Sequence, residues 1–507
     1  MINRRAFIGA GAALTTGLLA TGAAGAGAAP RRSAAKWDQL RAALGGDLVL
    51  PGDAGYDTAR QLANAQFDTI HPQAVAYCDS ARDVSTCIRF AQDHGIHTAV
   101  RSGGHSYAGW STTEGLVINL TRLDHVRAAE RTVHLGPGVQ AVDVIPQLAP
   151  LGLSAPAGFC ATVSPGGFVT GGGTGWQYRK YGPASDRLVA AQVVLADGRI
   201  VTASERCHPD LLWALRGGGG GNFGVVTDFE LAPTHLTHLA HYTLTWSWDV
   251  ADRAVAGYLD WLIQASADIA CDGVVLLADA APGAAPVFLV TGVHLSSMEA
   301  LEDELRTLTD LVGTPPASRV VQEMTYQQAM MTVFGCEGDT VDQCHITGSN
   351  PHAQLPRRSY VKNRGRMFDR RMPQEGIDRM LAAFDADRKA GQNRIISLLG
   401  LGKNANEPAV DATAWQHRDA LYSATMTVST PTATPEPAEQ AAADQWLDGV
   451  FDAVDPFSNG HSYVNFPDTG LRDWADAYYG PNLPRLSRIK RHYDPHGFFR
   501  FPQSVPR

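Results

Sequence analysis

Glycine-rich loops that adjoin short β-type runs constrain this chain most. The first, Arg101-Ser102-Gly103-Gly104-His105-Ser106-Tyr107, directly follows the β-type run 98–100. A strand that runs into such a loop presents several backbone N–H groups on one side, and such groups bind anions. Glycine also allows positive φ and a close approach of a ligand to bare backbone. The sequence therefore predicts a ligand site built largely from main chain.

Two further glycine sets follow at a distance. Gly158-Phe159-Cys160 leads into Ser164-Pro165-Gly166-Gly167 and Gly171-Gly172-Gly173-Thr174-Gly175, and a last set runs from Arg216-Gly217 to Gly224. Each run alone is typical of a flexible loop. The order of the three glycine sets and the residues that accompany them favour one shared site. His105 and Cys160 lie so far apart in sequence that the fold, and not a local turn, must bring them together.

Length and charge narrow the class of protein. A chain of 507 residues exceeds what one hydrophobic core usually serves, so we expect two domains. The apolar fraction of 44% and the charged fraction of 18% are those of an ordinary globular protein. A formal net charge of −9, without a long basic run, excludes nucleic acid as an expected partner.

The first 30 residues have a different composition from the rest. Arg4-Arg5 precedes a mildly apolar run of Ala, Gly, Leu and Thr that ends near Ala26-Gly27-Ala28-Ala29. Paired arginines before such a run and a small-residue cleavage site indicate a twin-arginine export signal. The alternatives are an ordinary secretory signal or a membrane anchor. The run is too short and glycine-rich for a stable span, so we expect a secreted, extracellular protein without stable membrane association.

The chain has seven cysteines. Because this number is odd, at least one cysteine of an exported protein would stay outside a disulfide, as a free thiol or in another role. Cys336 and Cys344 bracket a short polar loop and are the expected disulfide. Cys78 and Cys87 form a second candidate pair, although Cys87 lies in an apolar helical pattern where a buried free thiol is equally expected. The chain has no Cys-x-x-Cys motif, and its histidines lack metal-ligand spacing, so we predict no metal site.

The pattern of elements changes along the chain. Between about residues 40 and 235, short β-type runs alternate with helical patterns. The sequence predicts strands over 74–77 and 98–100 and a helix over 82–94, which Gly95 ends. From 241 to 450, long alternating strands such as 242–248 occur with amphipathic helices such as 298–311. The last 50 residues form a loop-rich tail that we expect to return to the first domain.

The motifs taken together resemble a known family. They comprise the 101–106 motif, Gly158-Phe159-Cys160 with Ser164-Pro165-Gly166-Gly167, the run 212–224, and a tail with Tyr463-Val464-Asn465-Phe466-Pro467-Asp468 and Ala477-Tyr478-Tyr479-Gly480-Pro481-Asn482. In this order they resemble the berberine-bridge-enzyme-like family. That family belongs to the flavin oxidoreductases of the vanillyl alcohol oxidase and p-cresol methylhydroxylase (PCMH) fold. The resemblance extends from about residue 45 to residue 507 and is weakest in the middle region.

The resemblance implies a two-domain α+β flavoprotein. A PCMH-type FAD-binding domain would span 40–236, after the signal at 1–30. A substrate domain with a large antiparallel sheet flanked by helices would span 237–454, and a C-terminal segment at 455–507 would return to the FAD domain.

The cofactor would be FAD with two covalent bonds, from His105 to the 8α-methyl carbon and from Cys160 to C6. A neutral imidazole and a thiolate are suitable nucleophiles for these bonds. The residues expected to contact FAD are Arg101, Ser102, Gly103, Gly104, His105, Ser106, Cys160, Val163, Gly166, Gly167, Gly171, Gly172, Gly224, Val225, Tyr463 and Asn465.

Two residues are expected to act in acid–base catalysis. Tyr463 falls on the active-site tyrosine of the family. A free phenol has a pKa of about 10, and lowering it by roughly three units takes about 4 kcal/mol, so a partner is expected. The candidate partner is Glu407, found by counting back from His417-Arg418. The glycine pair usual just upstream is here Gly402-Lys403, a departure from the family pattern.

The activity implied is hydride transfer from an alcohol or hemiacetal of an oligosaccharide or secreted natural product to FAD. Val163 is small enough to leave O2 a path to the flavin, which favours an oxidase that releases H2O2. A dehydrogenase with a non-oxygen acceptor is the alternative enzyme. A secreted protein that retains flavin without turnover is the alternative from another class. Oligomeric state stays open.

Overall fold

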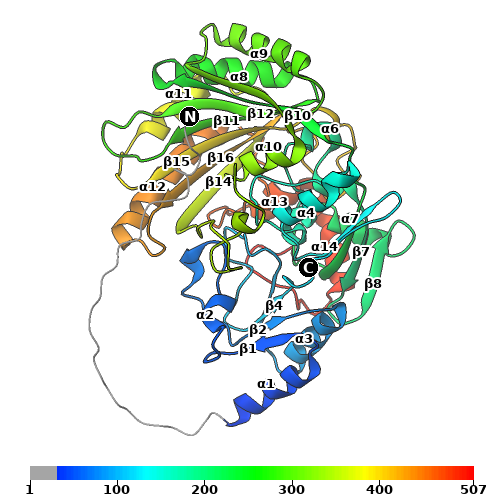
Figure 1. The fold of residues 1–507 in the computed structure, drawn as a ribbon. Helices are drawn as coiled ribbons and strands as arrows, with labels where there is room; N and C mark the ends of the chain where they lie inside the picture. Colours follow the sequence, from blue (N-terminus) through cyan, green and yellow to red (C-terminus); the bar gives the residue numbers. More distant parts are fainter. Residues whose placement is uncertain (1–30) are drawn as a thin grey trace.

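The computed structural model describes residues 31–507, which build three β-sheets in two domains (Figure 1). The predicted export signal at 1–30 lies outside the described residues. The chain begins with α1 (Arg31–Ala43), α2 (Tyr56–Ala59) and η2 (Ala65–Phe67). Among the described residues, no helix combines the length and apolar character needed to cross a bilayer.

The first sheet has the order β1 (Asp47–Val49), β2 (Ala74–Tyr77), β4 (Leu116–Asn119), β3 (Thr98–Arg101). β2 and β3 pair with β4 in parallel, so their C-terminal ends share one edge. The predicted helix 82–94 is α3 (Ala81–Asp93), which begins where the Ser80 side chain accepts a hydrogen bond from Asp83 N. Both β2 and β3 match the predicted strands closely.

The second sheet is antiparallel. Its order is β5 (Val126–Ala128), β6 (Val133–Leu135), β9 (Val225–Leu231), β7 (Leu188–Val194), β8 (Ile200–Ser204). Between its strands lie α4 (Ala141–Leu148), η3 (Ala149–Leu151), α5 (Pro165–Thr170), α6 (Tyr178–Tyr181), η4 (Ala184–Arg187) and α7 (Pro209–Leu215). The glycine run 216–224 therefore connects α7 to β9.

The third sheet has seven antiparallel strands and forms the core of the second domain, here called the sheet domain (residues 237–454). Its order is β13 (Ser318–Thr325), β10 (His238–Ser247), β12 (Val287–His294), β11 (Ile269–Leu277), β15 (Asn393–Gly400), β16 (Tyr422–Thr430), β14 (Tyr360–Phe368). Figure 1 shows α8 (Ala251–Gln264), α9 (Met298–Val312), α11 (Gln374–Asp385) and α12 (Pro437–Val454) on one side of it. The shorter helices are η5 (Trp248–Val250), α10 (Tyr326–Val333), η6 (Asp342–Cys344), η7 (Lys403–Asn406) and η8 (Asp455–Phe457).

Alternation along the strands explains why the four long helices cover one face of this sheet, whereas the short α10 packs at the β10 end of the other face. On β16, Met426 and Val428 are buried in the same core as Trp446 of α12. Thr425 and Thr427, one residue out of phase, are half-buried on the opposite face. Ser397 of β15 pairs with Thr425 and lies on that same face. The sheet thus turns a hydroxyl-bearing face toward the other domain.

The C-terminal segment returns to the N-terminal domain, as the sequence predicts. It contains α13 (Trp474–Tyr479), η9 (Gly480–Asn482) and α14 (Leu483–Tyr493). The Lys490 ammonium is buried and donates to Asn222 O and Phe499 O, each at 2.6 Å, and to the Asp494 carboxylate at 2.8 Å. These bonds fix the glycine run 216–224 to the tail.

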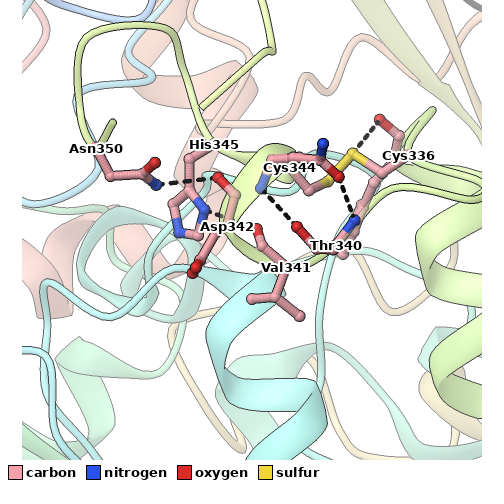
Figure 2. The surroundings of a disulfide bond; sticks show 9 residues. Cys336, Thr340, Val341, Asp342, Cys344, His345 and Asn350 are labelled. Carbon is pink, nitrogen blue, oxygen red and sulfur yellow. Dashed lines mark hydrogen bonds between the residues drawn. A yellow bond between two sulfur atoms is a disulfide. The ribbon is translucent and has the colours of Figure 1, made fainter. Parts of the chain in front are cut away.

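The predicted disulfide joins Cys336 and Cys344 (Figure 2). It closes a short turn at the start of the long loop 334–359, in which Asn350 Nδ2 donates to Asp342 O at 3.0 Å. Cys78 and Cys87 are buried free thiols whose sulfurs are 4.0 Å apart. Cys87 was expected either to form a disulfide with Cys78 or to be a buried free thiol, and the structure shows the buried free thiol.

Candidate functional site

One cavity of about 670 Å³ opens between the glycine loops, the sheet domain and the C-terminal segment. Its volume is typical of a binding site for a cofactor or small molecule. β3 delivers the 102–107 loop to it, and β15 contributes Ile395 and Ser397. The structure therefore brings all three glycine sets to one place, together with His105 and Cys160.

Most of the residues expected to contact the cofactor line this cavity. They are Ser102, Gly103, Gly104, His105, Ser106, Cys160, Val163, Gly166, Gly167, Gly224, Val225, Tyr463 and Asn465. Four expected site residues, Arg101, Gly171, Gly172 and Glu407, do not line the cavity.

Arg101 is buried beneath the loop and is not part of the cavity wall. Its guanidinium donates to the carbonyl oxygens of Ala59 at 2.6 Å, Gln61 at 3.2 Å and Ser111 at 3.1 Å. Burial lowers its pKa to about 10, so it remains a cation at neutral pH. Arg101 therefore ties α2 and its following loop to the end of β3.

Gly171 and Gly172 also lie behind the wall. A Cβ on Gly171 would lie 2.0 Å from Asn465 Oδ1, and one on Gly172 would lie 2.3 Å from the Trp415 ring. These glycines are required because the C-terminal segment and Trp415 pack directly on their backbone.

Glu407 does not join the site. It is exposed after η7 and is not one of the residues that line the cavity. The preceding turn explains the family's glycine pair: Gly402 has φ +78° and Lys403 φ +59°, a left-handed conformation that favours glycine. Lys403 occupies it with its ammonium donating to Ile263 O at 2.8 Å. Glu407 was chosen by counting residues through this loop, and the fold places its carboxylate on the surface.

His105 is held in the wall as a neutral imidazole. Its Nε2 is 2.8 Å from Thr162 Oγ1, a hydrogen bond that leaves Nδ1 for another partner. Desolvation, and secondly the charge of Arg358, lower its pKa to about 3. A neutral imidazole at all physiological pH values is the form that can act as a nucleophile.

Cys160 contacts a cation that the sequence did not reveal. Arg358 Nη2 donates to the Cys160 sulfur at 3.1 Å, and Arg358 Nη1 donates to the Tyr107 hydroxyl at 2.8 Å. Tyr107 and then Cys160 are the chief causes of a raised Arg358 pKa. Arg358 comes from the loop before β14, in the sheet domain. No motif surrounds it, so only the tertiary fold shows its place.

Tyr463 is buried and fixed from two directions. Its hydroxyl accepts hydrogen bonds from Gly173 N at 2.8 Å and from Asn465 Nδ2 at 2.9 Å. Desolvation nevertheless raises its pKa to about 12, opposite to the lowering expected for a base at neutral pH. Tyr463 is therefore a neutral phenol in this structure, suited to hold an oxygen atom of a ligand.

The sheet domain adds a second polar group that sequence reasoning missed. Ser397 lines the cavity, and its hydroxyl donates to the Asp272 carboxylate at 2.8 Å. The two residues face each other from β15 and β11. The alternating pattern predicts which face each side chain takes, but only strand pairing shows that they meet.

The cavity fits a flat dinucleotide such as FAD. Gly167 lines the wall, and apart from its chain neighbours and its own helix backbone no atom lies within 4 Å of a Cβ added to it, so a side chain there would take ligand space. The Ser164 hydroxyl bonds Gly138 O and does not cap α5, which leaves the amides of the first turn of α5 for another acceptor. Neutral His105 and the Cys160 sulfur then offer two nucleophiles to a ring.

Comparisons with known proteins agree with this fit. Residues 72–204 match the FAD binding domain family, and residues 462–506 match the family described as berberine and berberine like. The first match contains both His105 and Cys160, and the second contains Tyr463 and Asn465.

Similarity extends over most of the chain. An FAD-linked oxidoreductase of Bacillus subtilis, YgaK, is 28% identical over 470 residues, which cover 91% of this chain and 97% of that protein. The (R)-6-hydroxynicotine oxidase of Paenarthrobacter nicotinovorans is 27% identical over 471 residues, 91% of this chain and 96% of that enzyme. The structure of BBE-like 1 from Physcomitrella patens superposes with a TM-score of 0.82 at 25% identity, covering 92% of this chain and 98% of that one. The chain thus contains matches to an FAD binding domain and to a berberine-like C-terminal segment, and it is similar over most of its length to FAD-linked oxidoreductases.

Proposed function

We propose that this oxidoreductase is an exported oxidase with bicovalent FAD. It would oxidise an alcohol or hemiacetal of an oligosaccharide or secreted natural product and pass the electrons to O2. The observation that carries the proposal is the meeting of His105 and Cys160 in one cavity walled by glycine backbone. The similarity to (R)-6-hydroxynicotine oxidase supports an oxidase, and Arg4-Arg5 before a Gly/Ala-rich run supports export.

Bound FAD supplies the hydride acceptor for such a reaction. The residues of the N-terminal domain would hold the cofactor, and the residues of the sheet domain would face the substrate. Gly167 would allow the backbone to contact the cofactor, and His105 and Cys160 would anchor it. Val163, a small residue in the same wall, would leave room for O2.

Two phenols would handle the hydroxyl proton of the substrate. Tyr463 is a neutral donor that would orient the substrate oxygen. The Tyr107 hydroxyl, whose oxygen accepts a hydrogen bond from the Arg358 guanidinium, would be the second group that contacts the substrate hydroxyl and orients its proton. Both residues line the cavity.

The substrate side of the cavity is suited to a polyhydroxylated ligand. Ser397, hydrogen-bonded to Asp272, lies on the sheet face that also carries Thr425 and Thr427. Hydroxyls and a carboxylate can both bind sugar hydroxyls, whereas the opposite face of the sheet is apolar.

The first experiment tests the cofactor link and the acceptor together. The purified mature protein is precipitated with acid, and we expect flavin absorbance to stay with the pellet. His105→Ala and Cys160→Ala should each retain tethered flavin, whereas the double variant should release it. Release from either single variant would contradict the two-bond proposal.

The second experiment identifies the electron acceptor. Turnover of candidate sugars and alcohols in air should release H2O2 in proportion to product. A flavin that is reduced by substrate and stays reduced in air would instead assign a dehydrogenase. A flavin that no tested alcohol reduces, with Tyr463→Phe making no difference, would assign a binding protein.

A further inference from the structure

We propose that Arg358 promotes the covalent bond between Cys160 and FAD by placing a guanidinium cation against the sulfur. The inference rests on the bicovalent FAD of the proposed function and adds a residue that acts through Cys160. Its geometric basis is the 3.1 Å contact from Arg358 Nη2 to the Cys160 sulfur inside the cavity wall.

The backbone of Arg358 is held firmly against the N-terminal domain. Arg358 N donates to Ala63 O at 3.0 Å, and Ala65 N donates to Arg358 O at 2.8 Å. The preceding residue, Arg357, forms two bonds to the Asp68 carboxylate, at 2.8 and 2.6 Å. Hydrogen bonds to the N-terminal domain therefore hold the sheet-domain loop at Arg357 and Arg358. They position the Arg358 side chain in the cavity wall.

The charge of Arg358 has no ordinary counter-ion. Among residues 31–507, no carboxylate oxygen lies within 4.0 Å of its guanidinium, in contrast to Arg357 and Asp68. The hydrogen-bond partners that it does have are the Cys160 sulfur and the Tyr107 hydroxyl. Arg358 is half-buried at the edge of the cavity, and a guanidinium drawn partly out of water requires compensation. Negative charge that develops on the Cys160 sulfur would lie directly beside this cation.

The same cation favours the deprotonated form of both nucleophiles, but the two depend on it to different degrees. A positive charge beside a cysteine favours the anionic sulfur, which is the nucleophilic form. It also contributes, after desolvation, to the lowered pKa of His105 and so favours the neutral imidazole. Because desolvation alone already keeps His105 neutral, we infer that only the Cys160 bond depends strongly on Arg358.

The proposed bond formation is balanced in atoms and electrons. The Cys160 sulfur supplies an electron pair to C6 of FAD, and the S–C6 bond replaces a C6–H bond. O2 accepts the two electrons released. One thiolate, one FAD, one O2 and one proton yield one thioether-linked oxidised FAD and one H2O2.

The test compares Arg358 variants of the full chain in two backgrounds. In His105→Ala, flavin can stay tethered only through Cys160. In Cys160→Ala, it can stay tethered only through His105. We would combine each background with Arg358→Met and with Arg358→Lys, and measure the tethered fraction by acid precipitation and by the intact mass of the chain.

We expect Arg358→Met to abolish tethering in the His105→Ala background and to leave it unchanged in the Cys160→Ala background. Arg358→Lys should restore part of the Cys160 tether, because it returns a cation without the guanidinium fork. His105→Ala/Tyr107→Phe is the matched control. It removes the other hydrogen-bond partner of Arg358 and should stay tethered.

Two outcomes would overturn the inference. Full tethering in His105→Ala/Arg358→Met would show that the sulfur needs no cation. Loss of tethered flavin from both Arg358→Met combinations would show that Arg358 merely maintains the fold of the cavity. Failure of the proposed function itself is distinguishable, because His105→Ala alone would then release its flavin with Arg358 intact.

Discussion

The two domains contribute to one cavity in different ways. The N-terminal domain contributes glycine backbone with His105 and Cys160, and these occur in contiguous motifs. The sheet domain contributes isolated side chains, Arg358 and Ser397, from a loop and a strand without any motif. Backbone recognition needs a run of permissive residues, which sequence displays. Side-chain recognition needs only one residue at the right place, which only the fold reveals.

The largest expected effect concerns what keeps the motif loops in place. Lys490→Met would leave the buried Asp494 carboxylate without its cation. It would also leave Asn222 O and Phe499 O without the N–H donors that the Lys490 ammonium provides. Breaking a buried pair from one side costs about 3–5 kcal/mol. We therefore expect that loss in the free energy of unfolding, measured by urea titration, together with reduced flavin content.

Arg491→Met is the matched control, because Arg491 is exposed on the next position of α14. It should change the free energy of unfolding by no more than about 0.5 kcal/mol. An equal effect of both variants would mean that the glycine run 216–224 keeps its shape without the C-terminal segment.

The next effect is on catalysis. Tyr463→Phe removes the hydroxyl that accepts from Gly173 N and Asn465 Nδ2. We expect kcat to fall by roughly 100-fold or more, the usual contribution of a group that positions or transfers a proton. Because the Tyr463 pKa is raised to about 12, the activity of wild-type protein should show no titration of this group between pH 6 and about 9.

The matched variant is Tyr107→Phe, which removes the phenol beside Arg358. If Tyr107 accepts the substrate proton, this variant should lose kcat and change the pH profile, whereas Tyr463→Phe should lower kcat at all pH values alike. An unaltered pH profile for Tyr107→Phe would assign the proton to another group.

These cases show what could be predicted from sequence. Alternation and capping suffice for β2, α3 and α9, and the short spacing of Cys336 and Cys344 suffices for the disulfide. The glycine sets indicate a backbone site because their conformational freedom is local. Arg358 could not be predicted, since its position depends on hydrogen bonds to Ala63 and Ala65, nearly 300 residues away. Glu407 was chosen by counting through a loop, whose path only tertiary contacts determine.

A third prediction separates ligand space from packing space within the motif. Gly167→Ala would place a methyl group that meets no atom within 4 Å beyond its chain neighbours and its own helix backbone, whereas Gly171→Ala would place one 2.0 Å from Asn465 Oδ1. We expect Gly167→Ala to lower flavin content without destabilising the flavin-free chain. Gly171→Ala should cost roughly 1–3 kcal/mol through overpacking. Thermal unfolding and the flavin-to-protein absorbance ratio distinguish them, and the reverse pattern would contradict this division.

The smallest effect links the two domains through a histidine. His345, next to the disulfide in Figure 2, places Nε2 3.1 Å from the Asp143 carboxylate of α4. The hydrogen bond with Asp143 raises the pKa of His345 above its ordinary value of about 6.5. A raised pKa in the folded state means that the contribution to stability is complete below about pH 6.5 and is lost as pH rises through the folded-state pKa.

Because Asp143 is one-third exposed, this contribution should not exceed about 1 kcal/mol. The free energy of unfolding of wild-type protein should therefore fall between pH 5.5 and pH 8.5. In Asp143→Asn, whose amide cannot stabilise the imidazolium by charge, this fall should be smaller by up to about 1 kcal/mol. If both proteins show the same pH dependence, the His345–Asp143 contact positions the two side chains but contributes no pH-dependent stability. The sheet domain would then be joined to α4 without a titrating contact, in keeping with the firmer attachment of the same loop through Arg357 and Asp68.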